Sequence, residues 1–135
     1  MNDYNRGIIE EFRANAGKLG GNYEGRPVLL LTTTGAKSGQ QHTTPVMYLP
    51  EGDDVYVFAS MAGAPKSPAW YHNLVANPGV TVEVGAERFQ AQAQVMDRAE
   101  RDRLYAKQAA IYSQFSEYEQ KTSRVIPVVR LSRAG

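Results

Sequence analysis

The sequence of 135 residues contains no cysteine, one tryptophan and two histidines. Without cysteine the chain cannot form a disulfide framework, a thiolate zinc site or a cysteine nucleophile. The histidines, His42 and His72, are thirty positions apart and have no carboxylate cluster near them, which leaves little from which to build a transition-metal site. We therefore expect a protein without a metal centre.

Long apolar runs and an excess of one charge are also missing. No stretch approaches the length of a membrane span, and Asp3, Glu10 and Glu11 do not fit the basic-then-apolar order of a secretory signal. The formal net charge is +1, with 42% hydrophobic and 21% charged residues, which is typical of a globular protein and argues against a nucleic-acid partner held by phosphate attraction. We expect one domain over 1–135 in a cytoplasmic protein.

The first part of the chain is predicted to be a helix followed by an antiparallel meander. Apolar residues recur at three-to-four spacing over 4–18, which predicts a helix within an N-terminal segment 1–20. Segments 28–34, 42–49 and 55–59 are rich in β-forming residues and predict three strands. The Pro-Glu-Gly-Asp turn at 50–53 makes the last two a hairpin.

A short helix is predicted over 69–76. Ser67 is expected to be its N-cap and Pro68 its first helical residue, and Asn77-Pro78 ends it. Two strands, 80–84 and 88–95, follow around a Gly-Ala turn.

The last part of the chain is predicted to contain helices and one more strand. Asp97 and Glu100 indicate a capped helix start, and a second short helix follows. Segment 125–131 reads as a strand in which Pro127 favours an edge position or a bulge. About six mostly antiparallel strands with flanking helices over 22–135 predict an α+β domain around a small barrel or curled sheet. The predicted order of helices and strands excludes a regular βαβ layout. The G-x-G-x-x-G motif of dinucleotide-binding Rossmann folds is also absent from the sequence.

Two polar loops are suited to an anion. The first, 32–40, has three threonines, two glycines and Lys37, so that its amides and hydroxyls can turn toward a phosphate. The second, 59–68, contains small residues and Lys66 and leads into a helix N-terminus. The alternatives are an ordinary surface turn for the first loop and simple helix capping by Ser67 for the second.

Aromatic side chains gather on two predicted helices. Trp70, Asn73 and Leu74 share a helical face, and the buried amide of Asn73 needs partners from the backbone or from a ligand. Tyr112, Phe115 and Tyr118 recur every three residues. Such a stripe usually packs against a sheet, but phenols can also line a pocket for a planar ligand and donate a proton.

The two loops and the tryptophan helix together carry a recognisable pattern. It consists of L-T-T-T-G-A-K-S-G at 31–39, W-Y-H-N-L at 70–74 and A-N-P at 76–78, with further matches at Pro45, Ser60, Gly63, Lys66, Pro68 and the closing V-I-P-V-V at 125–129. This pattern resembles the deazaflavin-dependent nitroreductase family of actinobacteria over most of the chain.

The resemblance implies a split β-barrel of the flavin-reductase type that uses the reduced deazaflavin coenzyme F420 to deliver a hydride to quinones, nitroaromatics or other activated unsaturated acceptors. It implies that the cofactor contacts Lys37, Ser38, Gly39, Gln40, His42, Pro45, Ala59, Ser60, Met61, Ala62, Gly63, Lys66, Ser67, Trp70, Tyr71 and Asn73. The acceptor is implied to lie against Met47, Ser60, Tyr112, Phe115 and Tyr118. Of these, Tyr112 or Tyr118, with Ser60, is expected to hold the acceptor's oxygen and relay a proton.

The chain also departs from the family pattern. Ala36, His42 and Met61 stand where the nitroimidazole-reducing member has basic residues, and Met47 and Phe115 replace tyrosines on the acceptor side. We therefore expect weaker or different anchoring of the acidic cofactor tail, and no strong nitroimidazole reduction.

Three alternatives remain open at the level of sequence. One is a split barrel that uses flavin mononucleotide, and another is a non-catalytic binder of a cofactor or hydrophobic ligand. The third concerns the oligomeric state and the membrane. We expect a small-molecule acceptor as the partner and a monomer. A dimer, and peripheral contact with the inner face of a membrane, are also compatible with the sequence.

Overall fold

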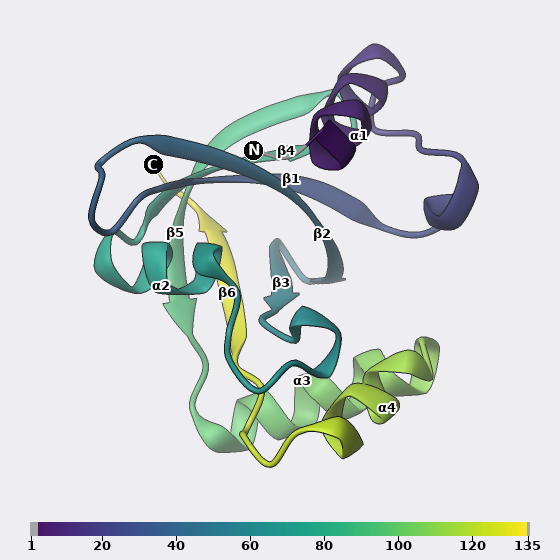
Figure 1. Cartoon of the computed structure of the whole chain (residues 1–135), viewed down its shortest axis with the longest axis vertical. Coiled ribbons are helices and arrows are strands. Elements are labelled where there is room, and N and C mark those ends of the chain that lie inside the picture. The colour runs from purple at the N-terminus through teal and green to yellow at the C-terminus, as the bar shows by residue number, and fades with distance from the viewer. Residues whose placement is uncertain (1–2, 135) are drawn as a thin grey trace.

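The computed structural model describes residues 3–134 and contains a closed antiparallel barrel with helices around it (Figure 1). The helices are α1 (Asp3–Ala14), α2 (Ala69–Ala76), α3 (Arg98–Ile111) and α4 (Gln114–Lys121), with short 3-10 turns η1 (Gly21–Tyr23) and η2 (Met61–Gly63). The strands are β1 (Val28–Thr34), β2 (Gln41–Glu51), β3 (Asp54–Phe58), β4 (Gly79–Val84), β5 (Glu87–Val95) and β6 (Val128–Arg133). The predicted α+β split barrel is confirmed.

The strand order around the barrel is β1-β2-β3-β6-β5-β4. The predicted meander β1–β2–β3 is present, with Leu31 opposite Thr44 and Leu49 opposite Tyr56. The last strand, β6, closes the ring because it pairs with both β3 and β5. The barrel is therefore complete only when the C-terminal strand has been added.

Three groups of apolar side chains hold the layers together. Leu29, Leu31, Val57 and others fill the barrel, where Trp70 and Leu74 of α2 join them. A second group, which includes Phe58 and Leu104, joins the barrel to α3 and α4. The third joins α1 to the outside of β1, and full burial of each large apolar side chain stabilises the fold by ~1.5–3 kcal/mol.

Helix α1 is fixed to the barrel by apolar and ionic contacts. Ile9 and Phe12 pack on Leu30 of β1. Arg13 donates two hydrogen bonds to the carboxylate of Glu83 on β4, from Nε at 3.1 Å and Nη2 at 2.9 Å. These contacts hold the second half of α1 against β1 and β4, at the top in Figure 1.

Two local predictions from the sequence are wrong. Pro68, not Ser67, is the N-cap of α2, and the hydroxyl of Ser67 accepts a hydrogen bond from Arg124 instead of capping the helix. Pro127 lies before β6 rather than inside it, so it needs no edge or bulge, and its carbonyl accepts from Ala59 N at 3.0 Å. By contrast, Asp97 does cap α3 through Glu100 N at 2.9 Å.

The helix and strand boundaries move by a few residues from those predicted. The largest difference is α1, which ends at Ala14 rather than near residue 18. None of the helices within residues 3–134 is both long and apolar enough to cross a bilayer.

Glu51 on β2 attaches α3 to the barrel and gives the stability a pH dependence. Its carboxylate accepts hydrogen bonds from Arg103 at 2.8 Å and Lys107 at 3.1 Å, which lower the pKa of Glu51 from 4.5 to about 2. A carboxyl whose pKa falls on folding stabilises the protein above its unfolded pKa, and this contribution disappears as the pH falls. We expect Glu51→Gln to be less stable than wild type at pH 7 and to lose less stability between pH 4.5 and about 2.

Urea unfolding measured across this pH range checks the prediction. Asp53→Asn changes an exposed carboxylate at the same turn and serves as the control. Parallel stability curves for Glu51→Gln and wild type would contradict the assignment.

Candidate functional site

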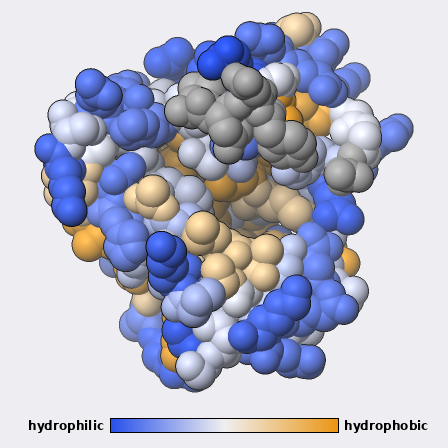
Figure 2. Space-filling model, in the orientation of Figure 1, coloured by the Kyte–Doolittle hydropathy of each residue, from blue (hydrophilic) through white to orange (hydrophobic). Residues whose placement is uncertain are grey.

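Two adjoining cavities open at the side of the barrel, with volumes of about 920 and 790 Å³. Asn5 of α1, Thr44 of β2 and Trp70 of α2 line both. Figure 2 shows a hollow on this face in which apolar surface is surrounded by polar residues. We call the larger the first cavity and the smaller the second cavity.

The loop between β1 and β2 forms one wall of the first cavity. Gly35 N donates to Gln40 O at 2.7 Å, Gly39 N donates to Gly35 O at 3.0 Å, and Gln40 N donates to Ser38 Oγ at 3.1 Å. Gly39 has φ 71°, a left-handed conformation that glycine adopts without steric cost. The loop is thus folded back on itself, as a polar loop of this composition predicts.

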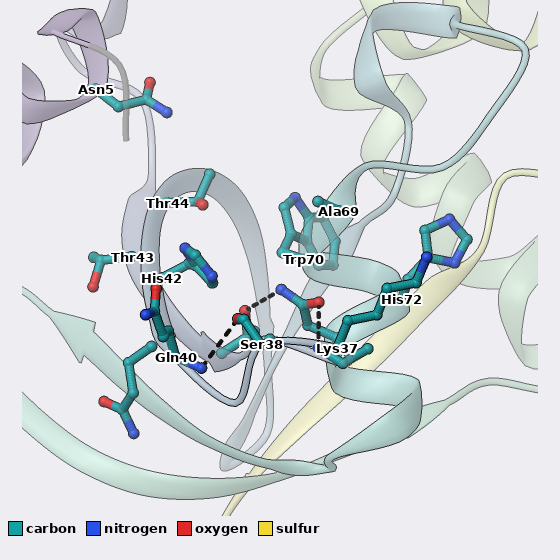
Figure 3. Close-up of a pocket in the computed structure, with 15 residues that line it drawn as sticks. Asn5, Lys37, Ser38, Gln40, His42, Thr43, Thr44, Ala69, Trp70 and His72 are labelled. Carbon is teal, nitrogen blue, oxygen red and sulfur yellow. Dashed lines mark hydrogen bonds between the residues drawn. The ribbon is translucent and has the colours of Figure 1, made fainter.

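Asn73 of α2 attaches this loop to the barrel. Its Oδ1 accepts from Ala36 N at 3.1 Å, and its Nδ2 donates to Thr33 Oγ1 at 3.2 Å. Figure 3 shows Trp70 on one side of the first cavity, His42 and Gln40 on the other, and Asn5 beyond them. The partners that the amide of Asn73 requires therefore come from the protein, while the side chain still lines the cavity.

The first cavity has a cationic or neutral lining. Lys37, His42 and His72 contribute to it, and no carboxylate is among its described lining residues. Backbone amides, hydroxyls and a lysine without competing acids are suited to an anionic group. The arrangement fits a phosphate or carboxylate better than a cation, and residues 3–134 bring together no group of three metal-binding side chains.

The second cavity is lined by many apolar side chains and by several polar ones, Arg26 among them. It is lined by side chains from β2, β3, the loop after β3, and α4, among them Met47, Phe58, Phe115, Tyr118 and Ser60. Ser60 is 9% exposed and contributes a hydroxyl to this lining. Such a pocket is suited to a flat organic molecule that carries an oxygen atom.

The loop after β3 has an unusual backbone. Met61 and Ala62 have φ 46° and 54°, and Gly63 has φ 84°. The left-handed region costs a non-glycine residue roughly 1–2 kcal/mol. A Cβ on Gly63 would lie 2.9 Å from Lys121 Cβ and 3.0 Å from Tyr118 O, so the loop packs directly on α4.

The aromatic stripe serves as core and as cavity wall at once. Phe115 is buried, and its ring lies 5.6 Å from that of Phe58 and 5.2 Å from that of Tyr118. Tyr105 donates to Phe115 O at 2.6 Å, and burial raises the pKa of its phenol, so this donor stays protonated. The bond fixes α4 relative to α3.

The structure brings many of the residues predicted from the sequence to these cavities. Those at the first cavity are Lys37, Ser38, Gln40, His42 and Asn73. Those at the second are Pro45, Met47, Ser60, Met61, Ala62, Phe115 and Tyr118, and Trp70 lines both. The predicted residues that line neither are Gly39, Ala59, Gly63, Lys66, Ser67, Tyr71 and Tyr112.

Other lining residues were not predicted. Asn5 comes from α1, and Tyr23 and Arg26 come from the segment that leads into β1. Their sequence neighbourhood carries no binding pattern. Asn5 reaches the site because α1 docks on the barrel, and Tyr23 and Arg26 reach it because they lie just before β1. His72 could have been found, since Ala69, His72 and Asn73 share one helical face.

The sequence matches the family model described as F420H(2)-dependent quinone reductase over residues 4–132. The chain belongs to this family. It is 41% identical over 128 residues to the F420H(2)-dependent quinone reductase of Mycobacterium tuberculosis strain H37Rv, covering 90% of this chain and 85% of that protein. The predicted resemblance to deazaflavin-dependent reductases is therefore confirmed.

Two solved structures extend the similarity to three dimensions. One is an F420-H2 dependent reductase, with a TM-score of 0.72 and 38% identity, covering 79% of this chain and 95% of that chain. The other is a domain-swapped dimer, with a TM-score of 0.74 and 34% identity, covering 96% and 98%. Because the family depends on F420, flavin mononucleotide is not needed as an alternative cofactor.

The first cavity fits the acidic part of F420. Gly35 leaves room there that a side chain would fill, since a Cβ would lie 2.4 Å from Ser38 Oγ and 3.3 Å from His42 Nε2. Lys37, Ser38 and His42 can therefore stand together around one anionic group.

We expect Gly35→Ala to displace Ser38, to lower the free energy of unfolding by about 1–3 kcal/mol and to weaken F420 binding. Chemical denaturation and fluorescence titration with F420 measure the two effects. Gly7→Ala in α1 is the matched control: a Cβ there meets nothing within 4 Å, and the change should stabilise the protein by ~0.5–1 kcal/mol. Unchanged F420 affinity in Gly35→Ala would contradict the role of this loop.

Proposed function

We propose that this protein is a reductase that transfers a hydride from reduced F420 to a quinone, and that nitroaromatics or other activated unsaturated compounds can replace the quinone. The observation that carries the proposal is the pair of cavities that adjoin at Trp70. Neither cavity has an acid in its described lining, and the second combines apolar side chains with the hydroxyl of Ser60 and the phenol of Tyr118, in a chain of the F420H(2)-dependent quinone reductase family.

The first cavity would hold the acidic tail of the cofactor. Lys37 supplies positive charge, Ser38 and the turned loop supply donors, and Trp70 would border the flat ring where the two cavities adjoin. When bound, the reduced deazaflavin supplies the hydride. The task of the protein is to hold both partners in place and to exclude water.

The second cavity would hold the acceptor. Phe58, Phe115 and Met47 provide apolar surface that keeps water away from the reacting atoms. Ser60 Oγ and the phenol of Tyr118 lie in the same lining and can hydrogen-bond a quinone oxygen as negative charge develops on it. Tyr118 would then donate a proton to that oxygen. Met47 and Phe115, where tyrosines are found in the nitroimidazole-reducing relative, disfavour nitroimidazole reduction.

The proposal is tested by titrating the protein with F420 and with flavin mononucleotide, and by following the oxidation of reduced F420 in the presence of menadione. Saturable, enzyme-dependent oxidation is expected, with F420 bound in preference to the flavin. Tight binding of F420 without turnover would replace the reductase by a carrier protein. Absence of F420 binding would exclude both.

We expect Tyr118→Phe to lower kcat for menadione about a hundredfold, because the proton donor is lost, and to leave F420 affinity nearly unchanged. Tyr112→Phe should have a much smaller effect, since Tyr112 lines neither cavity. Steady-state kinetics and F420 titration of both variants measure this. Equal losses of kcat in the two variants, or a parallel loss of F420 affinity in Tyr118→Phe, would count against Tyr118 as the donor.

We further propose that the protein is a cytoplasmic monomer, with at most peripheral membrane contact. The monomer is supported by the closed ring of strands, in which each described strand is paired on both sides. The related domain-swapped dimer makes mass in solution the measurement that decides.

A further inference from the structure

Arg124 lies between α4 and β6 and binds the loop after β3. Its Nε donates to Ala64 O at 3.0 Å, and its Nη1 donates to Ser67 Oγ at 3.2 Å. Its Nη2 donates to Ala59 O at 3.0 Å and to Ser60 O at 3.1 Å. One half-buried guanidinium therefore ties together both ends of a loop about sixty residues earlier in the chain.

These hydrogen bonds enclose the left-handed segment of the loop. Met61 and Ala62 are held in a conformation that non-glycine residues avoid, and the fixed carbonyls of Ala59, Ser60 and Ala64 flank them. Strain of this kind persists only where surrounding contacts determine the backbone. Arg124 provides four such contacts from a single side chain.

The direction of the carbonyls determines the direction of the neighbouring amides. Each peptide bond here is trans, so the N–H of Ser60 points away from Ala59 O, and the N–H of Met61 points away from Ser60 O. Both carbonyls point to Arg124, which does not line the second cavity, whereas Ser60 and Met61 do. Within residues 3–134, neither of these two N–H groups has a protein acceptor.

We propose that Arg124 is a positioning residue, which holds the amides of Ser60 and Met61 toward the second cavity as donors for an oxygen atom of a bound ligand. Successive amides in such a turn form a concave donor site for a carbonyl or anionic oxygen. That the ligand is F420 rests on the proposed function. The positioning of the loop itself does not.

Arginine is suited to this task because its planar fork presents several donors in fixed directions. A lysine has one ammonium group on a flexible stem, and it can satisfy only part of the set of acceptors. Arg124→Lys should therefore retain part of the effect, and Arg124→Met should retain none.

Arg101→Met is the matched control. Arg101 is a buried arginine that, like Arg124, donates to backbone carbonyl groups in this region, since its Nε donates to Ile126 O at 2.8 Å. It also pairs with Asp102 and with Glu119 of α4, so its hydrogen bonds go to residues outside 59–67. Its removal tests whether general loosening of this region is sufficient to explain an effect.

The first measurement is amide hydrogen exchange without any ligand. Gly63 N donates to Ser60 O and Ala64 N donates to Met61 O, so both amides report on the loop. We expect Arg124→Met to accelerate their exchange about tenfold, and Arg101→Met to leave it near the wild-type rate. Wild-type exchange in Arg124→Met, or equal acceleration in both variants, would overturn the proposal.

The second measurement is the affinity for F420. We expect Arg124→Met to bind about tenfold more weakly, the loss that about one hydrogen bond explains, with Arg124→Lys in between. The two methionine variants are compared at similar thermal stability. If Arg124→Met then binds F420 at least as tightly as Arg101→Met does, the proposal is also overturned. If wild type does not bind F420, the proposed function fails, and the exchange experiment still decides the role of Arg124.

Discussion

The hydrogen-bonded closure of the barrel by β6 is the constraint on which the site depends. Because β6 pairs with β3, the residue that follows β3 meets the residue that precedes β6, and Ala59 N donates to Pro127 O. The loop after β3 and the α4–β6 connection are thereby brought side by side (Figure 1). The loop after β3 forms part of the wall of the second cavity, and the α4–β6 connection holds this loop in place through Arg124.

Several residues of the site belong to the hydrophobic core or to the supporting hydrogen bonds as well. Trp70 is only 7% exposed, yet it lines both cavities. Asn73 ties α2 to the β1–β2 loop, and Phe115 is buried against Phe58. One side chain can thus have both a structural role and a binding role, because part of it packs on the protein while another part lines a cavity. Ligand affinity and stability are coupled for the same reason.

The parts of the structure that could be predicted from the sequence are those that local chemistry determines. The meander, the Asp97 cap and the folded-back loop around Lys37 and Ser38 follow from strand patterns, capping and glycine placement. Other features depend on residues distant in sequence. Ser67 has a cap-forming side chain, but Arg124 takes its hydroxyl. Tyr112 has the spacing of the aromatic stripe, but its extended backbone ends α3 there and separates it from Tyr118.

The closed ring of strands has a consequence for self-association. Throughout the described chain, every strand has a neighbour on both sides, so the barrel offers no unpaired edge to which a second copy could add a strand. Two copies can share strands only if each first breaks its own ring and then exchanges an element with the other. Such an exchange requires partial unfolding, so monomers and exchanged dimers would interconvert slowly, and their proportions would reflect the history of the sample.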